Sequence, residues 1–295
     1  MRLTSVIISI VASAILLAQC DMPRKKKEEP THPQRPAPPV WKKPAQKISY
    51  HAERAKEWSR KKKDSLNSAQ QKIIMVVNRV DMANLPSLDS IIIPNDLSGD
   101  IAYYLPFPLQ LPFLDDISKI VFFSYPAQAF AAYEYGNLVY AGPSNMGRKK
   151  DPTPTGLYFT NWKAEETTST FNDEWILKWN FNIQNKAGIG WHQYALPGYP
   201  ASHSCLRLLE DDARFLYKWA DEWKLKGTDS IILKGTPVIV FGAYPFDGQK
   251  PWFSLITEPH ALDIPAGELE DLVKPHLQEI LTAQEKRWSF VAKPK

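Results

Sequence analysis

The sequence predicts a mainly β fold with peripheral helices, an α+β protein, and three observations indicate it. Between residues 101 and 245, short β-branched and aromatic runs are separated by Gly, Pro and Asn, as in KIVFFSY, TGLYFT and GTPVIVFG. Apolar residues at helical spacing interrupt these runs once, from Glu210 onward. The chain is 44% hydrophobic and 12% aromatic over 295 residues, which is enough to build a sizeable core.

The first nineteen residues have the pattern of an export signal. Arg2 is followed by an uncharged apolar run that ends at Ala18, which is too short for a comfortable membrane span. Cys20 stands where this run stops, and the segment resembles a bacterial lipoprotein signal, in which that cysteine is diacylated. Gln19 departs from the small residue usual before it, and a simple signal peptide with an incidental cysteine is the alternative. We expect export to the cell envelope or periplasm, with a lipid anchor on Cys20 holding the protein at the membrane.

Residues 20–47 form a segment rich in proline and lysine without apolar periodicity. Proline at this density favours extended polyproline II structure, which would give the segment a reach of about 80 Å. We interpret it as a tether between the membrane anchor and the folded part of the chain.

Residues 48–100 are predicted to form a small helical module. ISYHAERAKEWSRKKK and SAQQKIIMVVNRVD both have helical patterns, and the β-branched run SIIIP follows them. The stretch NRVDMANLPSLDSIIIPND resembles the second half of a LysM carbohydrate-binding repeat, but the pattern reveals no first strand. Glycan binding and a packing appendage to the main domain are both open interpretations.

The remaining chain divides into a β domain, residues 101–245, and a helical extension, residues 246–295. In the helix predicted after Glu210, Asp211 and Asp212 fall in the first turn, where the helix dipole favours acids. The extension contains PAGELEDLVKPHLQEILTAQEKRW, in which Pro275 predicts a kinked or broken helix packed on the β domain.

Charge and ligand spacing exclude other classes of function. The net charge of +4 is mild, and the Lys/Arg runs at 24–27 and 60–63 lie in polar, weakly periodic sequence. These features favour a solvated surface over a nucleic-acid-binding face. No spacing of His, Cys, Asp and Glu suggests a metal site, and no cofactor is expected.

The stretch ASHSCLRLLEDDARF places Cys205 among polar residues. A free cysteine is most often buried and inert. However, burying the polar side chains of Ser202, His203, Ser204 and Arg207 in an apolar core would be energetically unfavourable. Histidine is the usual base that activates a cysteine. His203 lies two residues before Cys205, and His192 can return to it across the loop QYALPGYPAS. We therefore interpret Cys205 as a nucleophile.

These residues resemble the signature of the YkuD-type L,D-transpeptidases, a histidine, a variable loop, then Ser/Thr-His-Gly-Cys followed by Arg or Asn. AFAAYEYGNLVYAG, MGRKKDPTPTGLYF, EDDARFLYKWAD and GTPVIVFG occur in the order used by that family, over about residues 117–245. The resemblance implies a β-sandwich or barrel catalytic domain.

The resemblance also implies roles for individual residues. Cys205 would be the acylated nucleophile, His192 the general base, and His203 a residue that shapes the oxyanion region. Arg207 would meet a substrate carboxylate, with a salt bridge to Asp211 or Asp212 as the structural alternative. Ser202 and Ser204 would contact substrate, and DPTPTG would line the groove.

Two departures from the family pattern affect the expected site. Ser204 stands where the family has glycine, which would strain the backbone if the position needs a positive φ. Gln193 stands where glycine is common, and the spacing from His192 to Cys205 is short.

The activity implied is acyl transfer on peptidoglycan stem peptides, with cross-links formed through a thioester on Cys205. Acylation by carbapenem-type β-lactams is also implied. The alternatives are an L,D-carboxypeptidase or another murein acyltransferase or hydrolase, and a catalytically impaired wall-binding lipoprotein.

Overall fold

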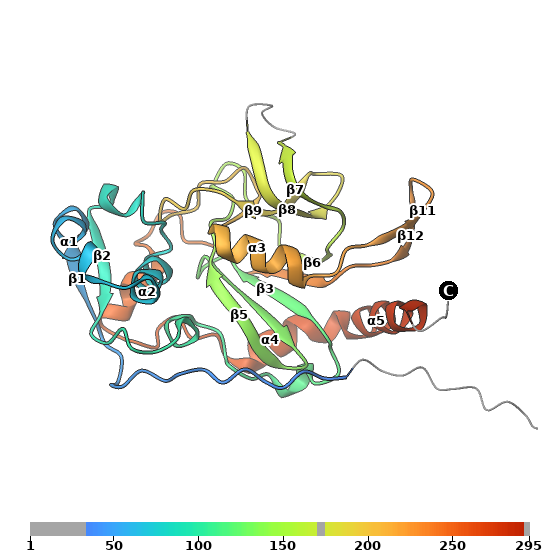
Figure 1. Cartoon of the computed structure of the whole chain (residues 1–295), viewed down its shortest axis with the longest axis horizontal. Coiled ribbons are helices and arrows are strands. Elements are labelled where there is room, and N and C mark those ends of the chain that lie inside the picture. Colours follow the sequence, from blue (N-terminus) through green and yellow to red (C-terminus); the bar gives the residue numbers. More distant parts are fainter. Residues whose placement is uncertain (1–33, 170–174, 292–295) are drawn as a thin grey trace, which may run out of the picture. The chain divides into compact units, whose positions relative to one another are not determined.

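The computed structural model describes residues 34–169 and 175–291 (Figure 1). The predicted signal segment and Cys20 lie outside the described residues. Within the described ranges, no helix is both long and apolar enough to cross a membrane.

A five-stranded sheet with the order β5-β4-β3-β13-β6 forms the centre of the fold. Its strands are β3 (Ile120–Ser124), β4 (Ala129–Glu134), β5 (Asn137–Pro143), β6 (Gly156–Phe159) and β13 (Pro237–Phe241). β13 runs parallel to β3, and the other neighbours are antiparallel. Between Glu134 and Asn137, Tyr135 and Gly136 both have positive φ, as a tight hairpin turn requires.

Both faces of this sheet are buried, because side chains along a strand alternate between its faces. On β3, Phe122 packs into one apolar cluster and Phe123 into another. β13 alternates in the same way, with Ile239 and Val240 on opposite faces. The sheet is therefore the middle layer of the domain.

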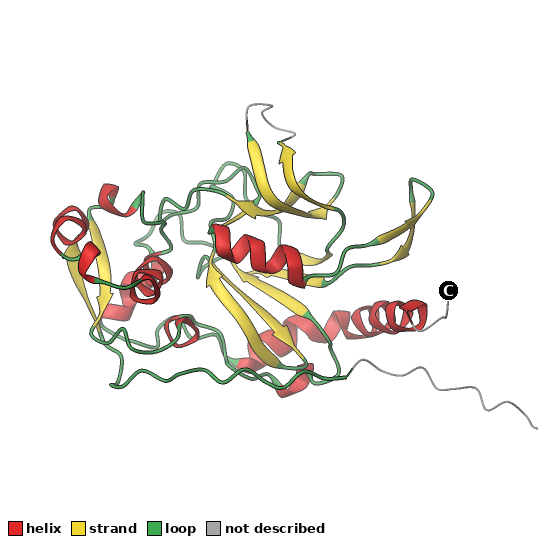
Figure 2. Cartoon of the chain, viewed as in Figure 1, coloured by secondary structure: helices red, strands yellow, loops and turns green. Residues whose placement is uncertain are grey.

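A second sheet, with the order β10-β9-β8-β7, covers one of these faces. It consists of β7 (Lys163–Thr168), β8 (Ile176–Gln184), β9 (Ile189–Gln193) and β10 (Leu206–Leu208). Helix α3 (Glu210–Trp219) packs on β8 and β9, and Ala213 and Leu216 join the shared core. A small hairpin of β11 (Lys224–Lys226) and β12 (Ser230–Leu233) follows. The predicted mainly β fold with peripheral helices is confirmed as a two-sheet sandwich (Figure 2).

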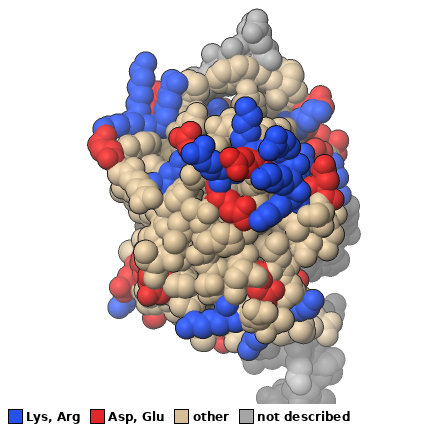
Figure 3. Space-filling model, turned by 90° about the vertical axis from the view of Figure 1, so that its left-hand side faces the viewer, with Lys and Arg blue, Asp and Glu red and all other residues tan. Residues whose placement is uncertain are grey.

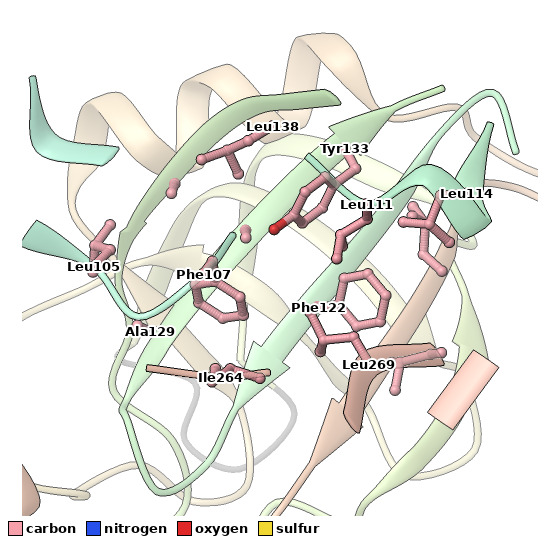
Figure 4. Packing of buried hydrophobic residues seen from close by; sticks show 14 of the residues in the cluster. Leu105, Phe107, Leu111, Leu114, Phe122, Ala129, Tyr133, Leu138, Ile264 and Leu269 are labelled. Atoms are coloured by element: carbon pink, nitrogen blue, oxygen red, sulfur yellow. The ribbon is translucent and has the colours of Figure 1, made fainter. Parts of the chain in front are cut away.

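Helices from the C-terminal extension cover the opposite face (Figure 4). Leu269 of α4 (Ala266–Val273) and Ile280 of α5 (Leu277–Val291) reach the cluster around Phe122 and Tyr133. As predicted, the helix is broken at Pro275, which lies in the 3-10 turn Lys274–His276.

Residues 50–94 form a βααβ unit, and here the helix predicted from the sequence is partly wrong. Tyr50–Arg54 is a strand, β1, that pairs antiparallel with β2 (Ser90–Pro94) across helices α1 (Ala55–Lys61) and α2 (Ser68–Asn78). The sequence YHAER has no alternation of apolar and polar residues that would have predicted a strand. The strand does not need one, because it pairs with β2 through backbone hydrogen bonds and buries only Tyr50. The unit therefore has a first strand, β1, which the sequence pattern did not reveal.

The βααβ unit is joined to the sandwich by a buried ion pair. Lys72 Nζ on α2 donates a 2.5 Å hydrogen bond to Asp212 Oδ1 on α3, and Asp212 is fully buried. The Tyr140 hydroxyl donates to the same oxygen at 2.9 Å. Asp212 is therefore an interface residue and not only an exposed acid favoured by the helix dipole.

The surface of this unit is mixed in charge. Figure 3 shows the face that carries it, where basic side chains gather with acidic ones among them. Helix α1 is an example, since Lys56, Arg60 and Lys61 are exposed beside Glu57.

Residues 35–47, predicted as part of the tether, belong instead to the folded unit. They run along its surface (Figure 1), where Trp41 Nε1 donates to Leu138 O at 3.1 Å and packs against the core. Arg35 lies over the Tyr135 ring at 4.9 Å, and Lys42 N donates to Asp100 at 2.6 Å. The boundary at residue 47 was wrong because one aromatic side chain anchors an otherwise proline-rich segment.

Candidate active site

Cys205 and His192 are brought together by parallel pairing of two short strands. Cys205 immediately precedes β10, which pairs with β9 so that Leu206 lies opposite Trp191 and Arg207 opposite His192. Leu206 and Trp191 are buried in the sandwich core. Because neighbouring side chains point to opposite faces, Cys205, Arg207 and His192 share the other face.

His192 is held as a neutral base. Its ring is buried, at 4% exposure, and Nδ1 lies 2.9 Å from the carbonyl oxygen of Gln193. Because a carbonyl can only accept, Nδ1 carries the proton and Nε2 presents a lone pair. Burial lowers the pKa of His192 to about 4, so the ring is uncharged at neutral pH.

Cys205 is partly exposed and is a protonated thiol at neutral pH. Burial raises its pKa above the usual range, while a backbone hydrogen bond from Gly190 and the nearby Arg207 oppose this effect. Its Sγ donates weakly to Gly188 O at 3.8 Å. The Ser202 hydroxyl donates to Cys205 O at 2.5 Å and fixes the turn before β10.

Ser204 has a φ of +74°, the left-handed conformation that favours glycine. The strain anticipated from the missing glycine is therefore present. Thr153 Oγ1 donates to Ser204 O at 2.9 Å, and Ser204 Oγ donates to Asp151 O at 3.3 Å. The DPTPTG segment thus supports the turn at Ser204. It is not among the residues that line the small Cys205 cavity, and its expected place along the substrate groove stays a prediction.

A small cavity of about 20 Å³ contains the thiol and the imidazole. Five residues predicted from the sequence line it, namely His192, Ser202, His203, Cys205 and Arg207, whereas Ser204 does not. Four further lining residues were missed: Ser169, Trp175, Leu177 and Tyr194. Their grouping depends on the β7-β8-β9 arrangement.

Aromatic rings frame this cavity. The Trp175 ring lies 5.3 Å from that of His203, and Tyr194 lies 5.8 Å from His192. Tyr194 was open to prediction, since it follows His192 by two residues and so projects from the same face if the extended backbone continues. Trp175 gave no such signal, because it is distant from both His192 and Cys205 in the sequence.

Arg207 stacks on an aromatic ring, and the alternative salt bridge is wrong. Its guanidinium lies 4.5 Å from the centre of the Tyr194 ring. Within the described ranges, Arg207 forms no ion pair, and Asp212 pairs with Lys72 instead. Burial lowers the pKa of Arg207. Arg207 therefore presents a positive group to the cavity.

The loop between His192 and Cys205 is held by the βααβ unit. Asp81 Oδ2 accepts a 2.7 Å hydrogen bond from Leu196 N, and Asp81 N donates to Leu196 O at 2.9 Å. Val80 forms a β-bridge with Pro197. The N-terminal unit thus fixes the crossover that aligns β10 with β9.

The fold and the site together define a two-sheet β domain with a cysteine–histidine pair at the end of paired parallel strands. Residues 118–240 match the family model of the YkuD L,D-transpeptidase catalytic domain. The resemblance predicted from the SHSC stretch is therefore confirmed for residues 118–240, which match the L,D-transpeptidase catalytic domain.

Solved L,D-transpeptidases are similar to part of the chain. One from Stackebrandtia nassauensis is 24% identical, covering 44% of this chain and 58% of its own, with a TM-score of 0.36. One from Mycobacterium smegmatis is 20% identical, covering 43% and 59%, with a TM-score of 0.34. L,D-transpeptidase 3 from Mycobacterium tuberculosis, in complex with a faropenem-derived adduct, is 22% identical, covering 43% and 61%, with a TM-score of 0.33. In each case the matched part spans less than two thirds of the solved chain. No curated protein matches the sequence significantly.

Proposed function

We propose that this protein cross-links peptidoglycan stem peptides through an acyl-enzyme on Cys205. The observation that carries the proposal is the state of His192, whose Nδ1 proton is tied to Gln193 O while Nε2 is left as the proton acceptor. A neutral imidazole beside a protonated thiol is suited to general-base activation during attack.

The reaction divides into two acyl-transfer steps. Cys205 Sγ bonds to the carbonyl carbon of the third, diamino-acid residue of a tetrapeptide stem, and His192 Nε2 takes the thiol proton. The amide bond to the terminal D-alanine breaks, and its nitrogen takes that proton from His192. An amine of a second stem then gives its proton to His192 and attacks the thioester, which releases the thiol and leaves an amide cross-link.

Backbone N–H groups next to the thiol are available for the oxyanion. Within the described part of the chain, neither Ser204 N nor Cys205 N donates a hydrogen bond. The left-handed turn at Ser204 separates these donors from the strand ladder of β10. Donors of this kind stabilise the tetrahedral intermediate of acyl transfer.

Positive charge near the thiol suits a substrate that carries carboxylates. Arg207 lines the cavity. The pKa of the neighbouring His203 is lowered first by burial and further by the charges of Arg148, Arg207 and Lys150, against an opposing effect of Asp151. Arg207 keeps its planar fork available for bidentate pairing with a carboxylate, because its stacking on Tyr194 uses the face of the guanidinium.

The test is incubation of the purified protein with a tetrapeptide muropeptide, followed by mass spectrometry. Wild type is expected to give a cross-linked dimer with loss of D-alanine, and Cys205→Ala none. A trimmed monomer would assign water as the acceptor and make the protein an L,D-carboxypeptidase. Product from Cys205→Ala would refute the mechanism, and an unchanged substrate with wild type would support the non-catalytic alternative.

We also propose that carbapenem-type β-lactams acylate Cys205. The thiol would attack the strained lactam carbonyl as it attacks the carbonyl of the stem peptide. The ring nitrogen that leaves the carbonyl stays attached to the rest of the drug, so no part of the drug is released. Intact-protein mass spectrometry after incubation with imipenem should show one added drug mass on wild type and none on Cys205→Ala.

Export and anchoring through Cys20 remain a proposal supported by the apolar run before it. Metabolic labelling with a fatty-acid analogue should tag wild type and not Cys20→Ala. Equal labelling of both proteins would remove the lipid-anchor proposal.

A further inference from the structure

Arg79 occupies a backbone position that disfavours it. It is the C-cap of α2, with a φ of 55° and a ψ of 35°, in the left-handed region where helices usually end with glycine or asparagine. A residue with a Cβ atom is strained in this conformation. Arg79 therefore adopts a strained backbone conformation at this position.

The guanidinium of Arg79 is also buried without an acid. The residue is 1% exposed, and no carboxylate forms an ion pair with it among the described residues. Nε donates to Ala127 O at 2.7 Å, Nη1 donates to Val76 O, and the group lies 5.6 Å from the Trp252 ring centre. Burial lowers its pKa only to about 10, so it stays charged at neutral pH.

One nitrogen of this group lacks a partner. Nη2 makes no hydrogen bond to any described residue. A buried charged donor left unsatisfied is costly, and native proteins avoid it unless something else pairs with it. The helix C-terminus compensates part of the charge through Val76 O but leaves Nη2 unused.

Arg79 lines a cavity of about 350 Å³, a size at the lower end of small-molecule pockets. Its walls are largely aromatic and apolar, formed by Tyr50, Tyr103, Leu105 and Leu262 among others. The cavity shares no lining residue with the Cys205 cavity, so it is a separate site.

The charged groups around the cavity favour an anionic ligand. Lys43 and Lys47 line it together with Arg79, while Asp263 supplies an opposing charge that is paired with His260 at 2.8 Å. Burial raises the pKa of Tyr50 to about 12, so its hydroxyl stays protonated and can donate a hydrogen bond. Inorganic phosphate has no apolar part to pack against the tyrosine and leucine walls, so an organic anion fits this cavity better.

We propose that this cavity binds a small organic monocarboxylate whose carboxylate pairs with Arg79 and whose apolar body packs against the tyrosine and leucine walls. The ligand holds together β1, the end of α2 and the segment after Trp252, all of which contribute to the cavity. The proposal does not depend on the reaction at Cys205.

Calorimetric titration of the purified protein tests this site. The probes are benzoate, 4-methylpentanoate and N-acetylalanine, with benzamide and 4-methylpentanamide as uncharged matches and inorganic phosphate as the alternative anion. At least one carboxylate should bind at least about tenfold more tightly than its matching amide, because a hydrogen bond between two charged groups is stronger than one to a neutral amide.

Three variants assign the binding to this cavity. Leu262→Trp fills the cavity from a partly buried wall position and should reduce carboxylate binding at least tenfold without lowering Tm. Arg79→Gln should remove the preference for carboxylate over amide. Cys205→Ala should bind like wild type, which separates this site from the catalytic one.

The proposal is overturned if none of the three carboxylates binds, or if the amides bind equally well. Tighter binding of phosphate, or unchanged binding in Leu262→Trp, would overturn it too. If Arg79→Gln fails to fold, the Leu262→Trp titration decides alone.

Discussion

Two groups of buried ionisable residues in this protein differ in charge: one group is neutral and the other is ionised. At Cys205 and His192, burial favours the uncharged forms, because it lowers the pKa of His192 and raises that of Cys205. At the junction with the βααβ unit, Lys72 instead forms an ion pair with a fully buried Asp212.

The difference follows from partners. His192 is given one backbone acceptor, which fixes its tautomer and leaves a basic nitrogen for chemistry. Asp212 is given two donors, Lys72 and Tyr140, which stabilise the carboxylate against the burial that raises its pKa. Neutral groups with unused bonding capacity suit a reaction, whereas paired charges hold two parts of a chain together.

The largest effect is expected from His192→Gln, which removes the only basic nitrogen offered to Cys205 by its strand neighbour. The initial rate of cross-link formation should fall about 10²–10⁴-fold, the usual contribution of a general base. His203→Gln, which changes a ring that lies tilted beside that of Trp175, is the control and should lose less than tenfold. Equal losses in both variants would contradict the assignment of the base.

Asp212→Ala tests the junction and should lower the free energy of unfolding by about 3–5 kcal/mol, because it leaves Lys72 beside an empty buried site. Asp247→Ala removes an exposed partner of Lys149 and should cost less than about 1 kcal/mol. Urea unfolding measures both, and similar costs would show that the buried pair does not join the two parts.

The neutral state of His192 predicts a specific pH dependence of stability. Its pKa is about 4 in the folded protein and about 6.5 when unfolded, so the unfolded state binds more protons between these values. The stability it contributes is complete above about pH 6.5 and falls by about 3 kcal/mol as pH drops to 4. The difference in unfolding free energy between wild type and His192→Gln should follow this curve, and a flat difference would contradict the low pKa.

The smallest effect concerns the strained turn. Because Ser204 has a φ of +74°, Ser204→Gly should be about 1 kcal/mol more stable than Ser204→Ala, which keeps the strain and loses the hydroxyl bond to Asp151 O. Thermal unfolding compares them. If alanine proves as stable as glycine, the turn is not strained.

Much of the site could be predicted from short-range sequence. The polar neighbours of Cys205 indicated a nucleophile with His192 and His203 as candidate bases, and the resemblance to the YkuD-type family selected His192. The β-branched runs indicated most strands of the central sheet. β7, with the sequence KAEETT, was missed because an exposed strand held by backbone pairing with β8 needs no apolar pattern.

Other features depended on residues distant in sequence. Trp175 reaches the site only because β8 lies beside β9, and Asp212 is buried only because α2 brings Lys72 against α3. Residues 35–47 were predicted as tether because proline composition cannot show that Trp41 docks on Leu138.

By itself, the sequence determined the mainly β class, the broken C-terminal helix and Cys205 as the candidate nucleophile, because periodicity and local residue type report on neighbouring positions. The choice of His192 over His203 as its base came from the family resemblance. Only the tertiary structure decided the tautomer of His192, the left-handed turn at Ser204, the closing strand of the βααβ unit, and the cavity at Arg79. Each of these depends on which distant groups supply hydrogen bonds or exclude water, and no local pattern contains that information.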